Sequence, residues 1–273
     1  MLALFGAALR RRELPSSLRA ELARSHALGV RWLLGMQNPD GGWAAYTKGH
    51  RSKRPGAGIT APMRFPPRLG ELRRCWADLP LAIGDPSTEG LSGRCVRALG
   101  LAGKRADDVA LVRAREFLIA QQTDFGGWWG RWLVNYLPTT AHILLGLAEI
   151  GADLRAPWIR RAIAWVQSKQ RADGGWGECA ESYADPSRAG TAETSMPGLT
   201  GLVASAMIAT GERDHPCTSK AIRYLLDAQD EHGAWPDHDW LAPSLPPRMF
   251  YRYPITTRFY PLAALGAWRS ASR

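Results

Sequence analysis

The residues whose types and spacing could do chemistry are four pairs of a glutamine and a tryptophan. In each pair the tryptophan lies six residues after the glutamine and a glycine lies two residues before the tryptophan: Gln37 and Trp43, Gln122 and Trp128, Gln170 and Trp176, Gln229 and Trp235. The amide and the indole of such a pair are hydrogen-bonding groups. We predict a structural role, in which the amide bonds free backbone groups of the next helix, covers unsatisfied donors there and lies under the indole.

The segments that must position these pairs have the hydrophobic periodicity of helices. Amphipathic segments over residues 17–36, 107–122, 157–170 and 218–228 precede the pairs, and more apolar segments at 139–150 and 200–209 alternate with them. Residues 1–9 resemble the tail of a buried helix, and residues 88–101 also have a helical pattern. Such alternation is expected of inner and outer helices that bury each other. We predict an all-α fold, an α/α-barrel or toroid without strands of consequence, as a single domain over residues 1–273.

Basic residues are concentrated in one stretch of the chain. The formal net charge is +10, and between residues 48 and 74 there are eight lysines or arginines and a single acidic residue. Residues 47–87 also contain six prolines, which predicts a basic loop inserted into the repeats. The loop is either simply solvated or in peripheral contact with an anionic membrane surface. No nucleic-acid motif accompanies it, so nucleic acid is not an expected partner.

Cysteine and histidine spacing gives no indication of a metal site. The four cysteines lie far apart without a C-x-x-C pair, which argues against a disulfide framework or a zinc ribbon and favours reduced thiols in a cytoplasmic protein. The six histidines add no ligand spacing. The N-terminal apolar stretch has its charges on the wrong side for an ordinary signal peptide. We expect no metal or cofactor.

Further motifs resemble the C-terminal half of squalene-hopene cyclases. Besides the four pairs, they are the run at residues 128–137, Gly174-Gly175-Trp176-Gly177-Glu178 with Ser182-Tyr183 and Asp185-Pro186, and Tyr260-Pro261-Leu262 before Ala264-Leu265-Gly266. The resemblance implies the terpenoid cyclase fold and a membrane-associated cytoplasmic enzyme. It also implies a squalene-like isoprenoid substrate and class II chemistry without metal or redox cofactor. In that chemistry an aspartic acid of a D-x-D-D motif protonates an alkene, and aromatic faces stabilise the carbocations.

Three aromatic residues fall on substrate-cavity positions of that family. They are Tyr46, three residues after Trp43, then Trp132 in Gly130-Arg131-Trp132, and Tyr253 near the C-terminus. We predict that these three residues bind substrate. The competing interpretation is that they fill a helical core.

The sequence also departs from the family pattern, and we assign no catalytic residue. D-x-D-D is absent, and neither Asp107-Asp108 nor Asp237-His238-Asp239 replaces it. The resemblance places an Asp and a His where this chain has Gly90 and Arg94. Further replacements are Pro138 and Thr256 for two cavity aromatics, and Leu199-Thr200-Gly201-Leu202 for a Q-T-A-W run.

Three functions therefore compete. The first is the C-terminal part of a cyclase that lacks its first helices and is inactive until an acid-bearing upstream region, an N-terminal half or an oligomeric partner completes it. The second is a non-catalytic isoprenoid or lipid binder, suggested by Gly90 and Arg94. The third, a protein prenyltransferase β-type subunit, would need a zinc site of Asp, Cys and His, whose spacing the sequence does not offer.

Overall fold

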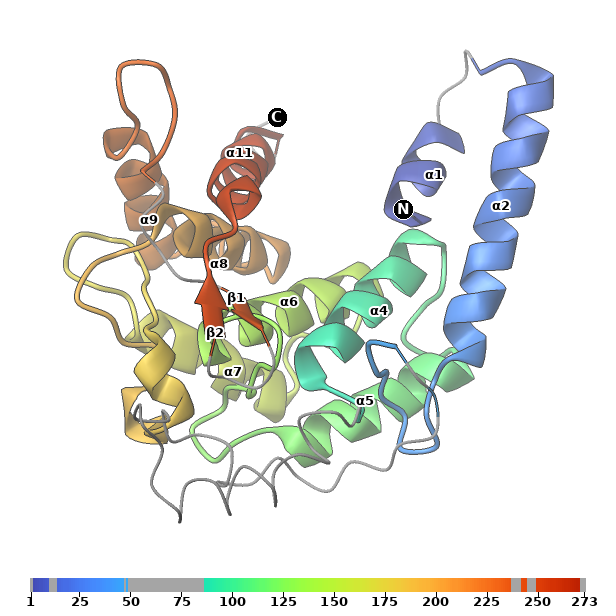
Figure 1. The fold of residues 1–273 in the computed structure, drawn as a ribbon, viewed down its shortest axis with the longest axis horizontal. Helices are drawn as coiled ribbons and strands as arrows, with labels where there is room; N and C mark the ends of the chain where they lie inside the picture. The colour runs from blue at the N-terminus through green and yellow to red at the C-terminus, as the bar shows by residue number, and fades with distance from the viewer. Residues whose placement is uncertain are drawn as a thin grey trace.

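The computed structural model describes residues 2–9, 14–46, 48, 86–236, 242–244 and 249–270. Over these residues the chain is helical apart from one small hairpin (Figure 1). The α-helices are α1 (Leu2–Leu9), α2 (Ser16–Gly35), α4 (Glu89–Leu101), α5 (Val109–Gln121), α6 (Tyr136–Glu149), α7 (Pro157–Ser168), α8 (Pro197–Ala209), α9 (Pro216–Asp227) and α11 (Pro254–Ser270). Two short 3-10 helices, η1 (Ala180–Tyr183) and η2 (Pro186–Arg188), lie between α7 and α8.

The helices form an inner and an outer layer. The inner helices α1, α4, α6, α8 and α11 pack on each other in that order, and α2, α5, α7 and α9 each pack on the neighbouring inner helix. In Figure 1 α1 and α11 lie at the two ends of the resulting arc. The predicted all-α toroid architecture is thus confirmed. The hairpin is its one exception among the described residues, with β1 (Ala242–Ser244) antiparallel to β2 (Met249–Tyr251).

Inner helices pack closely because small residues lie where they cross. A side chain at Gly93 of α4 would come within 2.9 Å of the Ile143 backbone of α6, and one at Gly201 of α8 within 2.4 Å of the Pro261 nitrogen of α11. Helix α6 is buried from residue 136 to residue 147, as its apolar sequence predicts. It ends before Gly151, which has the positive φ of 71° expected of a glycine after a helix C-terminus.

Each glutamine–tryptophan pair joins several helices through hydrogen bonds. In the third pair the Trp176 indole donates to the Val166 carbonyl of α7 at 2.8 Å, and the Gln170 amide donates to the Cys217 carbonyl of α9 at 2.6 Å. The Trp176 backbone N–H donates to Thr200 Oγ1 of α8 at 2.9 Å. One repeat therefore ties an outer helix to the next outer helix and to the next inner helix. The first two pairs repeat this pattern.

The predicted linking role is confirmed, but the predicted chemistry was wrong in one respect. The glutamine amides donate to carbonyl groups, so they satisfy acceptors rather than free N–H donors. The carbonyls that the indoles bind lie in the last turn of an outer helix, where the regular bond from a residue four positions later is missing.

The fourth pair differs from the other three. Gln229 donates to the Gly233 carbonyl of its own turn at 2.9 Å and, among the described residues, to no second helix. A side chain at Gly174 of the third pair would come within 2.7 Å of the Lys220 carbonyl of α9, whereas one at Gly233 would meet nothing closer than 3.7 Å. The fourth turn therefore has no neighbour of the kind that the first three have among the described residues.

This difference provides a matched pair of substitutions. We expect Gln170→Ala to lower the free energy of unfolding by about 1–2 kcal/mol, because two carbonyls lose their donor, and Gln229→Ala to lower it by less than about 0.5 kcal/mol. Urea unfolding of both variants measures the two values. Equal losses in the two variants would contradict the linking role of Gln170.

Several sequence predictions concern residues outside the described ranges. Nearly all of the predicted basic loop at residues 47–87 lies there, as does Asp237-His238-Asp239. Among the described residues Cys95, Cys179 and Cys217 are free thiols, as predicted. None of the described helices has the length and apolar character that a membrane span requires.

Candidate ligand pocket

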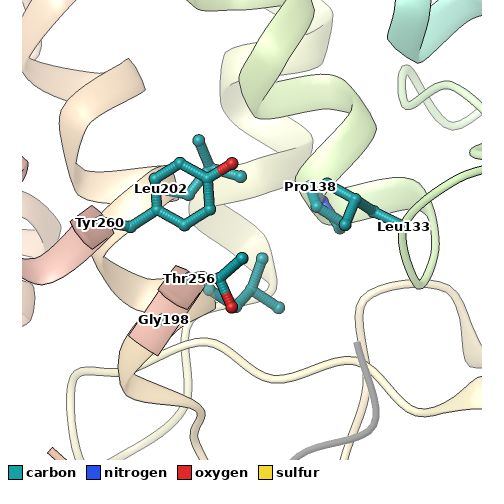
Figure 2. Close-up of a pocket in the computed structure, with 7 residues that line it drawn as sticks. Leu133, Pro138, Gly198, Leu202, Thr256 and Tyr260 are labelled. Carbon is teal, nitrogen blue, oxygen red and sulfur yellow. The ribbon is translucent and has the colours of Figure 1, made fainter. Parts of the chain in front are cut away.

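A small pocket with a cavity volume of about 10 Å³, partly open to solvent, lies between inner helices α6, α8 and α11. Its lining is almost entirely apolar: Leu133, Pro138, Gly198, Leu199, Leu202, Thr256 and Tyr260. Figure 2 shows Tyr260, Leu202 and Thr256 gathered on one side, with Pro138 and Leu133 facing them. Such a pocket suits a hydrocarbon group and offers little to a fully polar ligand.

The helical repeat places the lining residues. Thr256 and Tyr260 are one turn apart on α11, and Gly198 and Leu202 are one turn apart on α8. Pro138 lies in the first turn of α6. The Leu133 backbone is held in place by a hydrogen bond of 2.9 Å that its carbonyl accepts from the Tyr183 hydroxyl.

A buried carboxyl group fixes the start of α6 beside the pocket. Glu178 accepts hydrogen bonds from the backbone N–H groups of Tyr136 and Leu137, at 3.1 and 2.6 Å. These N–H groups have no partner within the helix, and the helix dipole favours a negative group at this end. Burial nevertheless raises the pKa of Glu178, and these hydrogen bonds oppose that rise. Glu178 follows Trp176 closely, so the third repeat also anchors an inner helix.

The three predicted aromatics lie outside the set that lines this pocket. Tyr46 and Trp132 are brought together edge to face, with ring centroids 5.9 Å apart, and the Arg131 guanidinium lies 5.2 Å from the Trp132 ring centroid. The Tyr46 side chain is 76% exposed and Tyr253 is 49% exposed, so neither fills a core. The Tyr253 carbonyl accepts a hydrogen bond from the hydroxyl of Thr256, which is one of the residues that line the pocket. A substrate-binding role for the three remains a prediction.

Four positions where the sequence departs from the cyclase pattern do line the pocket: Pro138, Thr256, Leu199 and Leu202. The sequence marks these four positions only as departures from the family pattern, and it does not single out Leu133, Gly198 or Tyr260 as site residues. The spacing of four between Thr256 and Tyr260 on a helix was the available signal.

Polar groups lie behind the Tyr260 ring. The Tyr260 hydroxyl lies 3.3 Å from Nε2 of His142, a buried residue of α6. Burial lowers the pKa of His142, and the positive charges of Arg94 and Arg97 lower it further, so this imidazole is neutral near pH 7. Burial raises the pKa of Tyr260, which keeps its hydroxyl protonated. Both groups can therefore donate or accept hydrogen bonds without carrying charge.

Glu89 is the other buried acid near the inner helices. It is the first residue of α4 and is 5% exposed. Burial raises its pKa to about 8. Glu89 lies next to Gly90, in the segment where the resemblance to squalene-hopene cyclases implies residues that support the aspartic acid of the D-x-D-D motif. Within the described residues, no three His, Cys, Asp or Glu side chains gather as a metal site would require.

The fold and this apolar pocket define the class of the protein as a terpenoid-cyclase-type α-helical toroid. A family model described as squalene-hopene cyclase C-terminal domain matches residues 72–270. The chain therefore belongs to this family.

Relatives and solved structures agree with this assignment. The chain is 32% identical over 253 residues to the squalene–hopene cyclase of Bradyrhizobium diazoefficiens, covering 89% of this chain and 34% of that protein. It is 32% identical over 261 residues to the squalene–hopene cyclase of Zymomonas mobilis, covering 94% and 37%. The chain thus spans about a third of the length of these curated relatives. The ent-copalyl diphosphate synthase from Streptomyces platensis shares the fold, with a TM-score of 0.52 and 20% identity over 98% of this chain and 50% of that one.

Proposed function

We propose that this chain forms the isoprenoid-binding C-terminal portion of a squalene-hopene-type polyprenyl cyclase. It would take part in the cyclisation of a linear isoprenoid when polypeptide that carries the D-x-D-D acid completes the site. The observation that carries the proposal is the small apolar pocket, partly open to solvent, between the inner helices α6, α8 and α11. Family membership gives that pocket its expected ligand, a hydrocarbon chain of repeated isoprene units.

The pocket volume limits what this chain can hold by itself. A cavity volume of about 10 Å³ is far below the range of roughly 300–1,000 Å³ that is usual for small-molecule sites. The pocket by itself therefore has room only for a small group, and a polyprene would have to displace side chains that line it. The rest of the hydrocarbon would lie against surfaces outside the pocket, where Tyr46, Trp132 and Tyr253 are candidates.

Filling the pocket tests the proposal. Leu202→Trp places an indole where the structure has a leucine, and we expect it to weaken squalene binding at least about tenfold, because burial of the displaced hydrocarbon is lost. Quenching of tryptophan fluorescence measures the binding of squalene in detergent. Because Leu202→Trp adds a fluorophore, a second variant, Thr256→Phe, blocks the same space without adding a tryptophan. Leu226→Phe, on the exposed side of α9, is the control. If both pocket variants are folded, as shown by their thermal unfolding, and bind squalene with the affinity of the wild type, the pocket assignment is wrong.

A second candidate is a non-catalytic isoprenoid or lipid binder. It is favoured by Gly90 and by Arg94, whose positive charge beside the interior would destabilise a carbocation. The complete reading frame that contains this chain, incubated with squalene, separates the two. Cyclised product supports the cyclase, whereas binding without product supports the binder. An in-frame or neighbouring sequence that encodes D-x-D-D is expected only for the cyclase.

A further inference from the structure

A second pocket, which has a cavity volume of about 290 Å³ and is partly open to solvent, lies between the outer helices α5 and α7. It also borders the end of the inner helix α6, at Leu147 and Ile150, whereas the pocket between α6, α8 and α11 involves the start of that helix, at Pro138. At a rise of about 1.5 Å per residue, Pro138 and Leu147 are about 14 Å apart along the helix axis. The second pocket is therefore a separate site on the outer side of the fold.

This second pocket has an apolar floor and room for a small molecule. Four of the side chains that line it are at most 3% exposed: Leu111, Leu147, Ile150 and Ile159. Three further lining residues are alanines, which fill little space: Ala106, Ala152 and Ala156. The cavity volume of about 290 Å³ is close to the lower end of the range of roughly 300–1,000 Å³ that is usual for small-molecule sites. It corresponds to about ten water molecules, and thus to a ligand of about 10 to 15 non-hydrogen atoms.

Contacts within the protein hold the walls of this pocket in place. The Trp158 carbonyl on α7 accepts a hydrogen bond of 2.8 Å from the Gln122 amide, and the Trp158 ring packs edge to face on Trp128 with ring centroids 6.1 Å apart. The second glutamine–tryptophan pair therefore fixes one wall. Elsewhere in the lining the Ala106 N–H donates to the Ile150 carbonyl at 3.0 Å. A ligand thus enters a formed cavity, without the loss of binding free energy that the ordering of mobile walls causes.

One positive and one negative side chain belong to the same lining. Arg115 lies on α5, one turn after Leu111 and one turn before Ile119, and Asp153 lies in the turn between α6 and α7. Both are exposed, so they lie at the opening rather than on the floor. Oδ1 of Asp153 accepts the Arg155 backbone N–H at 3.0 Å, which orients the carboxylate and leaves Oδ2 for another donor. A ligand with a single charge is attracted by one of these groups and repelled by the other, whereas a zwitterion is complementary to both.

We propose that this pocket binds a free α-amino acid with a large apolar side chain. The carboxylate of the ligand pairs with the Arg115 guanidinium, whose fork of N–H donors suits a carboxylate, and its ammonium group pairs with the Asp153 carboxylate. The apolar side chain of the ligand lies on the floor of the pocket, beside the Trp158 ring. The inference goes beyond isoprenoid binding and does not depend on it.

NMR titration of the full chain with four probes tests the proposal, because NMR measures weak binding and reports which residues are affected. Phenylalanine carries both charges and the ring, 3-phenylpropionate lacks the ammonium, phenethylamine lacks the carboxylate, and alanine lacks the ring. We expect phenylalanine to bind about fivefold tighter than either singly charged probe, since ion pairs at an opening contribute modestly. It should bind at least about tenfold tighter than alanine, since burial of the ring is then lost. The indole N–H signal of Trp158 should shift with phenylalanine.

Substitutions at the opening assign each charge. Arg115→Met should abolish the preference for phenylalanine over phenethylamine. Asp153→Asn should abolish the preference for phenylalanine over 3-phenylpropionate, while the asparagine oxygen keeps the hydrogen bond of the turn. Arg223→Met and Asp227→Asn, both exposed on α9, are the matched controls and should leave both preferences unchanged. All four positions are exposed, so each variant should unfold near the temperature of the wild type.

Filling the cavity separates this site from binding elsewhere on the surface. Ala152→Phe should remove phenylalanine binding. If this variant is folded, as shown by its thermal unfolding, and binds phenylalanine with the affinity of the wild type, the ligand does not occupy this pocket. Equal affinities for phenylalanine and the two singly charged probes, or preferences that stay unchanged in Arg115→Met and Asp153→Asn, would overturn recognition of the zwitterion. Binding of none of the probes would overturn the site, and squalene binding to the other pocket is measured independently of all these results.

Discussion

Replacing Trp176 by alanine is expected to lower the free energy of unfolding by about 3–5 kcal/mol, the range found for large aromatic residues removed from cores. The Trp176 side chain is fully buried. Its indole N–H donates to the Val166 carbonyl of α7, so truncation leaves a cavity and removes one of the hydrogen bonds to that carbonyl. Urea unfolding followed by circular dichroism measures the loss. Such a variant has little stability to spare, because natural domains have only about 5–15 kcal/mol.

Two companion variants divide this effect into its parts. Trp176→Phe keeps most of the buried ring but removes the donor, and we expect it to lose about 1–2 kcal/mol. Trp32→Ala is the control: this tryptophan on α2 is 64% exposed, and its loss should change stability by about 0.5 kcal/mol or less. A Trp176→Ala variant as stable as Trp32→Ala would show that the third repeat does not hold the helices together.

Glu89 is expected to make stability fall as the pH rises. Burial raises the pKa of Glu89 from 4.5 to about 8 in the folded chain, while in the unfolded chain the carboxyl ionises near 4.5. Between these two values the folded state binds one more proton than the unfolded state. The stability linked to Glu89 is therefore fully present below pH 4.5 and is lost towards pH 8, at about 1.4 kcal/mol per pH unit.

Comparison with Glu89→Gln isolates this contribution. Glutamine cannot ionise, so the variant should have nearly wild-type stability at pH 4.5 and should exceed it by several kcal/mol at pH 7.5. The His142 imidazole opposes the trend, because burial lowers its pKa and its contribution is lost as the pH falls. It is present in both proteins and cancels in the difference. Glu116→Gln, exposed on α5, is the control. A stability difference between Glu89→Gln and wild type that is the same at both pH values would contradict the prediction.

Much of the fold follows from local sequence patterns. Apart from α11, for which no helix is predicted, the described helices lie within a few residues of their predicted ends, because hydrophobic periodicity and residues such as Pro157 act over one or two turns. Helix α6 was predicted to start at residue 139 and starts at Tyr136, since Glu178 from a distant segment satisfies the N–H groups of Tyr136 and Leu137. The hairpin of β1 and β2 was not predicted, because its strands are only three residues long.

The site was less predictable than the fold. Aromatic side chains at family positions point to Tyr46, Trp132 and Tyr253, whereas the pocket is lined, apart from Tyr260, by small and aliphatic residues that sequence patterns do not distinguish from core.

The links between repeats also bear on how such chains change in evolution. The glutamine of the first, second and third pairs reaches a carbonyl 73, 36 and 47 residues further along the chain, always the second residue of the next outer helix. The indole always bonds a carbonyl ten residues before it. Insertions and deletions between a pair and the next outer helix can therefore accumulate without loss of these hydrogen bonds. Insertion or deletion of a single residue within the ten-residue spacing would instead break the bond of the indole. Length variation among related chains should accordingly fall between the pairs and spare each ten-residue unit.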